Sequence, residues 1–543
     1  MTFRSTLLTR PFLTLVALGL AWPVLAILGT WLGVDSEGAD ILWAMAATVL
    51  PEYAWTSVLL FLGVGLGVVV LGTASAVAVT LYEFPLRRFF EWALLLPMAM
   101  PAYVLAYAYT DFLQYSGPLA SAWRELTGTS ARAWPDVRSL GGAMWVFSLA
   151  LYPYVYVLAR AALAERAHPL MEAARMLGAS AWRRLFRVVL PLVRPALAAG
   201  VALAMMEVLA DFGVSSYFGI QTFTAGIYKA WLSMDQRWAA AQLATVLLLC
   251  VGTLLAWEKR AQARQRYAHA RPDRLGPESQ PRALGGLTGW SMTCACALPV
   301  VLGFAGPVAI LLWTWLGADS DLTFSASRFL VWAGNSLWLS GLTAVLATAL
   351  AWALVAQERL QPNWGTRSLR GLVGLGYAMP GAVVVVGLLW PLGWLQSNWP
   401  ALGAGQWLTA TVLGLVWGYL VRFVAVAMQS VQSGYSRIPA AVDDSARMLG
   451  ISGWGLMTRV HGAMLRRPLI AAMLLVFVDV MKELPVTLVL RPFNTDTLAV
   501  MAHQLARDER LGEAALPSLA LVLVGLIPVL LLSRALGQRA GAN

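Results

Sequence analysis

Long apolar segments, separated by shorter polar ones, follow one another along the whole chain. Many contain about 18 or more residues, enough for a helix to cross a hydrocarbon core about 30 Å thick. They are continuously apolar, whereas the strands of a membrane barrel alternate between apolar and polar positions. The pattern predicts an all-α polytopic membrane protein with twelve transmembrane helices, at 12–33, 56–81, 89–113, 140–163, 193–215, 238–257, 289–316, 334–357, 370–394, 406–430, 468–490 and 514–533.

Composition and charge support this class of protein. The residues are 59% hydrophobic and 12% charged, whereas soluble domains carry about 25% charged residues. The net charge of +11 could indicate nucleic-acid binding, but the basic residues are spread over polar segments that flank the predicted spans. Most of them fall on one side of the membrane if both termini are cytoplasmic, as the positive-inside rule requires. We therefore expect membrane lipid and no nucleic acid as a partner, and a location in a bacterial inner membrane.

A charged segment that contains proline and glycine divides the predicted spans into two groups of six. We expect a first half at 1–260, a cytoplasmic linker at 261–286 and a second half at 287–543. Because each half has an even number of spans, the halves are expected to be parallel, pseudo-symmetric repeats. Each half also contains an Ala-Met-Pro sequence, ending at Pro101 and at Pro380. These prolines are expected to kink or interrupt the third and ninth spans.

Two further repeats relate the halves at one common offset. The sequence ARMLGAS at 174–180 recurs as ARMLGIS at 446–452, and EVLAD at 207–211 recurs as DVMKE at 479–483. The first repeat lies in two polar cassettes, each between the fourth and fifth spans of its half. One interpretation is an amphipathic helix on the membrane surface. The recurrence of the glycine and of small residues at matching positions favours docking of a partner protein instead.

The first cassette, 166–191, predicts two short helices. Pro169 is expected to precede a helix near 170–177, which Gly178 ends in left-handed backbone. Ser180 then caps a second helix, which Pro191 is expected to stop. In the second cassette, 438–468, the matching positions are held by Gly450 and Ser452.

The first cassette resembles the EAA loop of ABC importer permeases. The matching residues are Glu172, Ala173, Ala174, Gly178 and Ala179, followed by Leu190 and Pro191. The resemblance implies the type I ABC importer permease fold and a coupling helix that docks in a cytoplasmic ATPase. The coupling residues it implies are Glu172, Ala173, Met176, Leu177, Gly178, Ala179, Asp444, Ala446, Met448, Leu449 and Gly450.

The second cassette departs from the family pattern. Asp444 replaces the glutamate, Ser445 the first alanine, and Ile451 the alanine after the glycine. We therefore expect the second cassette to couple less strongly than the first.

The chain does not carry the elements of a nucleotide-hydrolysing enzyme. A P-loop needs a Gly-Lys-Ser/Thr sequence, and Lys229, Lys259 and Lys482 follow tyrosine, glutamate and methionine. We therefore expect a transport subunit with no cofactor of its own. ATP and magnesium would be used by two copies of a separate ATPase subunit. A periplasmic or lipid-anchored binding protein would deliver the substrate.

Four acids lie in predicted spans, at Glu207, Asp211, Asp479 and Glu483. Charges inside a bilayer are costly and mark transport pathways, so these carboxylates are interpreted as lining the substrate path. The alternatives are structural pairing, for instance with Lys482, or hydration at the external ends of the spans. Weak oxygen ligands would suit a hard cation that passes through, and no tightly bound metal is expected.

The segments around these acids resemble the ferric-iron branch of fused ABC permeases, which implies ferric iron as substrate. Permeases for thiamine, sulfate, polyamines or phosphonate share the EAA pattern and remain alternatives. A twelve-helix secondary transporter, driven by protons or sodium, is the alternative from another class, because buried carboxylates can relay protons. The paired cassettes favour the ABC importer, since a secondary transporter has no ATPase to engage.

Overall fold

The computed structural model describes residues 3–33, 36–128, 134–268, 282–317, 326–409 and 411–540. This part of the chain is helical, apart from one parallel pairing of β1 (Tyr82–Glu83) with β2 (Arg282–Ala283). The prediction of an all-α chain is thereby confirmed for the described residues. Contacts divide the chain into two compact units.

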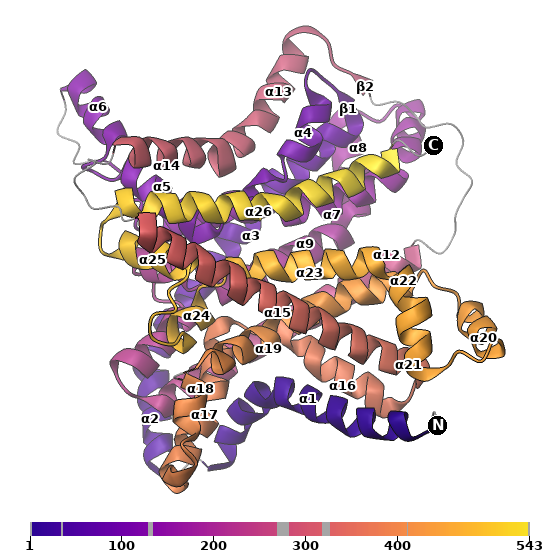
Figure 1. The fold of residues 1–543 in the computed structure, drawn as a ribbon. Coiled ribbons are helices and arrows are strands. Elements are labelled where there is room, and N and C mark those ends of the chain that lie inside the picture. The colour runs from indigo at the N-terminus through magenta and orange to yellow at the C-terminus, as the bar shows by residue number, and fades with distance from the viewer. Residues whose placement is uncertain are drawn as a thin grey trace. The chain divides into compact units, whose positions relative to one another are not determined.

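The first unit comprises Met1–Ala47, Gly226–Leu248 and Ser325–Met501. Its helices are α1 (Phe3–Gly29), α15 (Ala326–Leu360), α16 (Trp364–Gly374), α17 (Gly381–Asn398), α18 (Ala404–Thr409), α19 (Val412–Tyr435), α20 (Ala440–Met448), α21 (Gly453–Gly455), α22 (Gly462–Met464), α23 (Arg466–Met481) and α24 (Pro485–Leu490). Within it α15, α19 and α23 pack against one another, and α1 packs along α17 (Figure 1).

The second unit comprises Thr48–Ala225, Leu249–Phe324 and Ala502–Asn543. Its helices are α3 (Leu50–Leu81), α4 (Arg87–Ala93), α5 (Ala102–Leu113), α6 (Pro118–Thr127), α7 (Leu140–Met176), α8 (Ala181–Arg184), α9 (Leu190–Ala210), α10 (Gly213–Phe218), α13 (Gly286–Val300), α14 (Gly306–Gly317) and α26 (Leu511–Ala540).

Four helices cross the boundary between the units along the chain, namely α2 (Ser36–Thr48), α11 (Phe223–Tyr228), α12 (Arg237–Ala268) and α25 (Leu498–Arg507). Short 3₁₀ segments lie at Thr30–Gly33, Leu96–Ala99, Leu375–Ala378 and Pro400–Leu402, and π segments at Leu185–Val189, Lys229–Ser233, Val301–Ala305 and Leu456–His461. Each unit contains residues from both sides of the 261–286 linker. The division of the sequence into two halves at that linker stays a prediction.

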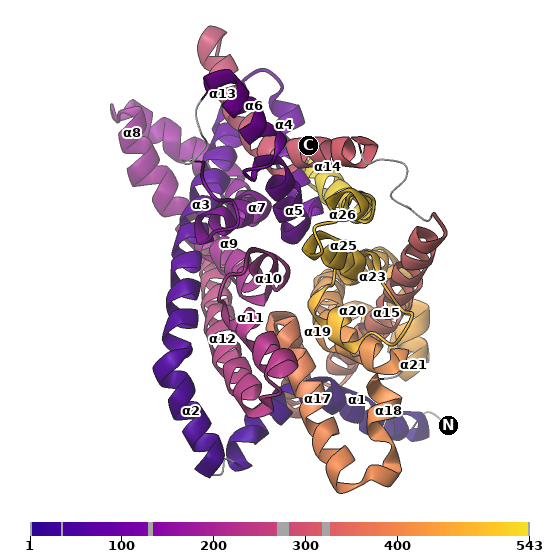
Figure 2. The same cartoon turned by 90° about the vertical axis from the view of Figure 1, so that its left-hand side faces the viewer.

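Small residues bring the helices of the second unit close together. Figure 2 shows α3, α7 and α9 lying side by side. Val155 of α7 lies between two glycines: a Cβ on Gly72 would come 2.7 Å from its Cβ, and a Cβ on Gly200 would come 2.8 Å from its Cα. Close packing of this kind is typical of membrane helices, where apolar surface alone gives no drive to associate.

Nine helical segments of the described residues are long and apolar enough to cross a membrane. A tenth is a pair bent by 89°, Arg87–Ala99 with Ala102–Thr127. The nine are Pro11–Leu32, Leu50–Leu81, Leu140–Ala164, Leu185–Ala210, Arg237–Ala261, Gly286–Gly317, Ala326–Leu360, Val412–Tyr435 and Leu511–Leu531. A multi-pass membrane chain is therefore confirmed, whereas the number twelve stays a prediction.

The prolines of the two Ala-Met-Pro sequences interrupt helices, as predicted. Pro101 lies immediately before α5 and Pro380 immediately before α17, both in extended backbone with ψ near 140° (139° and 145°). A 3₁₀ turn precedes each break, at Leu96–Ala99 and Leu375–Ala378. The predicted span 468–490 is also interrupted, because α23 ends at Met481 and α24 begins at Pro485. These apolar stretches are therefore built from shorter helices.

Candidate coupling cassettes and span carboxylates

The first cassette begins inside a long helix. The helix α7 runs without a break from Leu140 to Met176, through Pro169. The prediction of a separate short helix after Pro169 is therefore wrong. The residues before this proline, Leu163 to Ala167, are mostly strong helix formers, so they keep the chain helical despite the lost N–H donor.

Gly178 ends this helix as predicted. Its φ is +75°, a left-handed conformation that glycine adopts without steric cost. The Gly178 N–H donates to the Arg175 carbonyl and the Ala179 N–H to the Ala174 carbonyl, at 2.9 and 3.0 Å. This is the Schellman pattern of helix ends. It leaves Met176 and Leu177 at the tip, 88% and 87% exposed.

Beyond the tip the chain returns to helix. Ser180 lies before α8, where its Oγ accepts a long hydrogen bond of 3.4 Å from the Arg183 N–H. The helix then passes through the π segment Leu185–Val189 into α9. The prediction that Pro191 stops this helix is wrong. Pro191 lies in the first turn of α9, where the wider π turn just before it accommodates a residue that lacks an N–H.

The second cassette has the same kind of tip, but a separate short helix leads to it instead of a continuous long one. Here α19 ends at Tyr435, and the separate helix α20 begins after Pro439. Gly450 has φ +78°. Its N–H donates to the Arg447 carbonyl at 2.9 Å, and the Ile451 N–H donates to the Ala446 carbonyl at the same distance. The exposed tip is formed by Met448 (89%) and Leu449 (80%).

The other predicted coupling residues differ in their exposure. Ala173 is exposed, Ala179 is half-buried and Ala446 is buried. Asp444 is exposed and pairs with Arg447, with a distance of 2.9 Å between Oδ1 and Nη1. Glu172 belongs to α7, and its side chain lies outside the described residues.

Ser452 precedes α21 without a side-chain capping hydrogen bond, so the prediction that it caps like Ser180 is wrong. Its backbone is extended, with φ −138° and ψ 167°. The helix that follows is only three residues long before the π segment Leu456–His461 begins.

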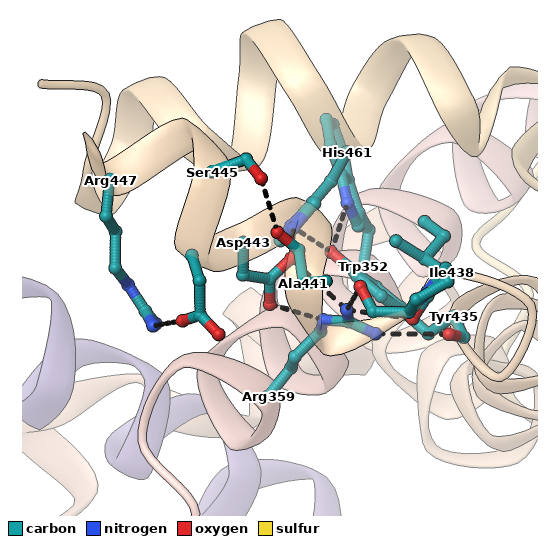
Figure 3. A network of polar contacts seen from close by, with 11 residues as sticks. Trp352, Arg359, Tyr435, Ile438, Ala441, Asp443, Ser445, Arg447 and His461 are labelled. Atoms are coloured by element: carbon teal, nitrogen blue, oxygen red, sulfur yellow. Dashed lines mark hydrogen bonds and ion pairs between the residues drawn. The ribbon is translucent and has the colours of Figure 1, made fainter. Parts of the chain in front are cut away.

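A polar network at the base of α20 was not predicted (Figure 3). The Arg359 side chain, from the last turn of α15, donates to both carboxylate oxygens of Asp443 at 2.8 and 3.2 Å. His461 is fully buried, and its Nε2 lies 2.9 Å from Asp443 Oδ1. Burial raises the pKa of Asp443, but its hydrogen bonds and charge interactions with Arg359 and His461 outweigh that effect and hold the pKa below the ordinary value.

Sequence reasoning missed this network for a physical reason. Asp443 precedes the matched acid Asp444, and His461 lies in a segment that repeats poorly between the cassettes. No local spacing relates either residue to Arg359, which lies more than eighty residues upstream of both. Only packing of α15 against the end of α19 brings these side chains together.

Two of the four predicted pathway acids hold short helices. Asp211 lies between α9 and α10, and its Oδ1 accepts from the N–H groups of Val214 and Ser215 at 2.9 and 3.4 Å. Glu483 lies between α23 and α24, and it accepts from the N–H groups of Val486 and Thr487, both at 3.0 Å. The two carboxylates therefore have one structural role at matching places in the sequence, since each caps the helix that follows an interrupted span.

Glu483 is also paired with a cation. Its side chain is 1% exposed, and its Oε1 lies 2.8 Å from Nη1 of Arg422 in α19. Thr487 Oγ1 donates to the other carboxylate oxygen at 2.9 Å. Lys482 pairs with Asp479, as one of the alternatives expected: its Nζ lies 3.9 Å from Asp479 Oδ1. The Asp479 side chain is 39% exposed. Glu207 is exposed on α9.

Within its own unit, neither pair of acids belongs to a metal-binding group of described residues. Among the residues with described placement, no set of three or more histidine, cysteine, aspartate or glutamate side chains could hold a metal ion. Asp211 and Glu483 direct their oxygens to backbone N–H groups. The carboxylates of Glu207 and Asp479 keep exposed surface.

Known proteins resemble this chain over most of its length. It is 24% identical to the Fe(3+)-transport system permease protein FbpB 2 of Haemophilus influenzae, over 89% of this chain and 90% of the relative. The ferric transport system permease protein FbpB of Actinobacillus pleuropneumoniae is 22% identical over 76% of this chain and 61% of the relative. The sulfate transport system permease protein CysW of Escherichia coli is 29% identical over 37% of this chain and 72% of the relative.

The family model for binding-protein-dependent transport system inner membrane components matches residues 68–265. This range includes the first cassette and the spans on either side of it. A component of this kind works with a binding protein and with an ATPase that hydrolyses ATP, so this chain is a transport subunit and not an enzyme. The match identifies residues 68–265 of this chain as an inner membrane component of a binding-protein-dependent transport system.

Proposed function

We propose that this chain forms the whole membrane pathway of an ATP-driven importer of ferric iron. It would receive the ion from a periplasmic or lipid-anchored binding protein and pass it inward through twelve spans. Both termini and both cassettes would lie in the cytoplasm. The observation that carries this proposal is the pair of glycine-terminated tips, each with two apolar side chains that are at least 80% exposed.

The tips have the properties of a docking surface for two copies of an ATPase. Met176 and Leu177 in one cassette, and Met448 and Leu449 in the other, are at least 80% exposed. Burying such a side chain in a partner stabilises a complex by about 1.5–3 kcal/mol. Two identical ATPase subunits would each need such a surface, which explains why the arrangement recurs at matching positions. Contact with water alone does not explain the recurrence.

Ferric iron is supported by two lines of argument. Relatives similar over most of this chain are ferric transport permeases by name, and the span acids supply the oxygen ligands that a hard cation prefers. Sulfate remains the second candidate, because a sulfate permease is 29% identical to part of this chain. Exposed carboxylates such as those of Glu207 and Asp479 would oppose an anion, so these acids favour the cation.

The test is transport by the reconstituted system. The chain, its ATPase and its binding protein are placed in proteoliposomes, and uptake of ferric iron is compared with uptake of sulfate. We expect ATP-dependent ferric iron uptake that needs the binding protein. Sulfate uptake would overturn the substrate. Uptake driven by a proton or sodium gradient without ATP would support the secondary transporter instead.

The pathway acids are expected to fall into two classes. Glu207 and Asp479 keep exposed carboxylate surface, so we propose that they contact the ion in transit. Replacing both with their amides, Glu207→Gln and Asp479→Asn, should lower iron uptake about tenfold or more, the effect of losing a charged interaction, while thermal stability stays close to that of the parent. Parental uptake by this double variant would show that these acids are structural only.

A further inference from the structure

The elbow between α19 and α20 depends on one arginine. Arg359 Nη1 donates to the Tyr435 carbonyl at 3.1 Å, and its Nη2 donates to the Ile438 carbonyl at 3.0 Å. The Tyr435 carbonyl also accepts from the Ile438 N–H at 3.0 Å, so this side chain adds a second hydrogen bond at the end of α19. The same guanidinium binds Asp443 in the first turn of α20. It therefore joins the end of one helix to the start of the next (Figure 3).

A buried chain of hydrogen bonds approaches Asp443 from the other side. Trp352 Nε1–H donates to the Tyr435 hydroxyl at 3.3 Å, and that hydroxyl lies 3.2 Å from His461 Nδ1. The Nε2–H of His461 donates to Asp443, and its Nδ1 shares a hydrogen bond with the Tyr435 hydroxyl. Every ring nitrogen and the hydroxyl then has a partner, which is the state that a buried polar network needs.

The positions of the first cassette that match Asp443, His461 and Tyr435 carry apolar residues, so this network is not repeated there. At the common offset, Met171, Val189 and Leu163 occupy the positions of Asp443, His461 and Tyr435. Val189 and Leu163 are fully buried apolar side chains. The first tip instead continues α7 without a break, so the backbone hydrogen bonds of one long helix link the tip to the span.

The helix α20 needs side-chain support because it is short. It has nine residues, and isolated helices shorter than about 12–15 residues are marginal in water. It packs against the π segment Leu456–His461, where His461 is also the hydrogen-bond partner of Asp443. The direction of α20 relative to α15 is therefore determined by the network.

We propose that Arg359, Asp443 and His461 are positioning residues that latch the second coupling helix to the spans. They transmit motion through side chains where the first cassette transmits it through continuous helix. The proposal rests on the proposed docking of an ATPase at the tips. None of the three residues forms part of the exposed tip, which consists of Met448 and Leu449.

The test uses the full chain with its ATPase and binding protein in proteoliposomes, and measures ferric iron taken up per ATP hydrolysed. The variant is Asp443→Asn, and the matched control is Met171→Asn at the same position of the first cassette. We expect the ATPase to co-purify with both variants, because Met448 and Leu449 are unchanged. Uptake per ATP should fall about tenfold in Asp443→Asn, the effect of losing a hydrogen bond between charged groups, and stay near parental in the control.

A second variant separates positioning from folding. His461→Phe keeps a buried ring and removes both of its hydrogen bonds, so it should lower the same ratio. Combining it with Asp443→Asn should add little, because residues of one network are not additive. Asp443→Glu, which keeps the charge, should restore part of the coupling.

The outcomes distinguish the two proposals. Parental uptake per ATP in Asp443→Asn and His461→Phe would overturn the latch while leaving the importer intact. An equal fall in Met171→Asn would overturn it as well, because the effect would not depend on the network. If the parent chain fails to bind the ATPase, the proposed function fails and the latch fails with it.

Discussion

Replacing Gly178 with valine is expected to abolish ATP-driven transport while leaving the chain folded. The left-handed conformation of Gly178, at φ +75°, costs a residue with a side chain roughly 1–2 kcal/mol. A Cβ at this position would meet nothing within 4 Å, so the chain itself has room for it. The new side chain would instead project from the tip beside Met176 and Leu177, where we propose that the ATPase docks.

A matched control is available in the same unit. Gly128 follows α6 with φ +63°, and a Cβ there would also meet nothing within 4 Å. Gly128→Val should therefore carry a similar backbone strain without reaching a cassette. We expect both variants to lower the thermal midpoint by a similar few degrees, and only Gly178→Val to lose the ATPase in co-purification. Normal co-purification with Gly178→Val would contradict the proposed docking.

The same change in the second cassette measures whether the sockets are equal. Gly450 has φ +78° and equally open surroundings, so Gly450→Val has the same local cost. The second cassette departs from the EAA pattern at Asp444, Ser445 and Ile451. We therefore expect a smaller loss of transport than with Gly178→Val, and equal losses would show two equivalent sockets.

Replacing Glu483 with alanine is expected to destabilise the chain more than any other single change proposed for the spans. It would leave Arg422 without its partner at 2.8 Å and would remove the acceptor for the Val486 and Thr487 N–H groups. Breaking a buried ion pair by removing one partner costs about 3–5 kcal/mol. A denaturant titration of the purified chain in detergent gives the free energy of unfolding, and its decrease measures this loss.

Two further variants define the cause. The double variant Glu483→Met with Arg422→Met should recover only the part of the stability that the unpaired arginine cost, because apolar residues of similar volume replace a buried pair at little cost. The Val486 and Thr487 N–H groups stay without their acceptor in this variant. Asp479→Ala should change the free energy of unfolding by less than about 1 kcal/mol, since its partner Lys482 lies 3.9 Å away and its side chain is 39% exposed. A Glu483→Ala midpoint equal to that of the parent would show that the pair contributes no net stability.

Several features of the fold could be predicted because their signals are local. Continuous apolar runs predicted helices, and the prolines at 101 and 380 predicted the breaks before α5 and α17. The left-handed helix end at Gly178 follows from the conformational freedom of one residue type. Each of these depends on residues within a few positions of one another.

Other predictions were wrong because a proline breaks a helix only where the neighbouring residues favour helix weakly. Pro169 and Pro191 both lie inside helices, whereas Pro439 precedes a helix after a real break. The stretch before Pro439 contains glycine, serine and isoleucine, which are weaker helix formers than the residues before Pro169. Arg359 in addition donates to the Tyr435 and Ile438 carbonyls at the break, and no residue near Pro439 in the sequence indicates that contact.

For the span carboxylates too, the sequence predicted only part of what the structure shows. Their positions inside apolar runs identified Glu207, Asp211, Asp479 and Glu483 as unusual, but not which partner each would have. In the structure, Asp211 and Glu483 cap short helices, and Glu483 binds Arg422 from another helix. A sequence shows that a buried charge needs compensation, and packing determines what supplies it.

The sequence by itself determined that this chain is a helical membrane protein with two glycine-terminated cassette tips, because hydropathy and backbone preference belong to single residues and their near neighbours. Only the tertiary structure decided how each tip joins its span, by continuous helix at α7 and by the Arg359–Asp443–His461 network at α20. That difference arises from side chains far apart in the sequence, whose contacts exist only once α15 and α19 have packed together.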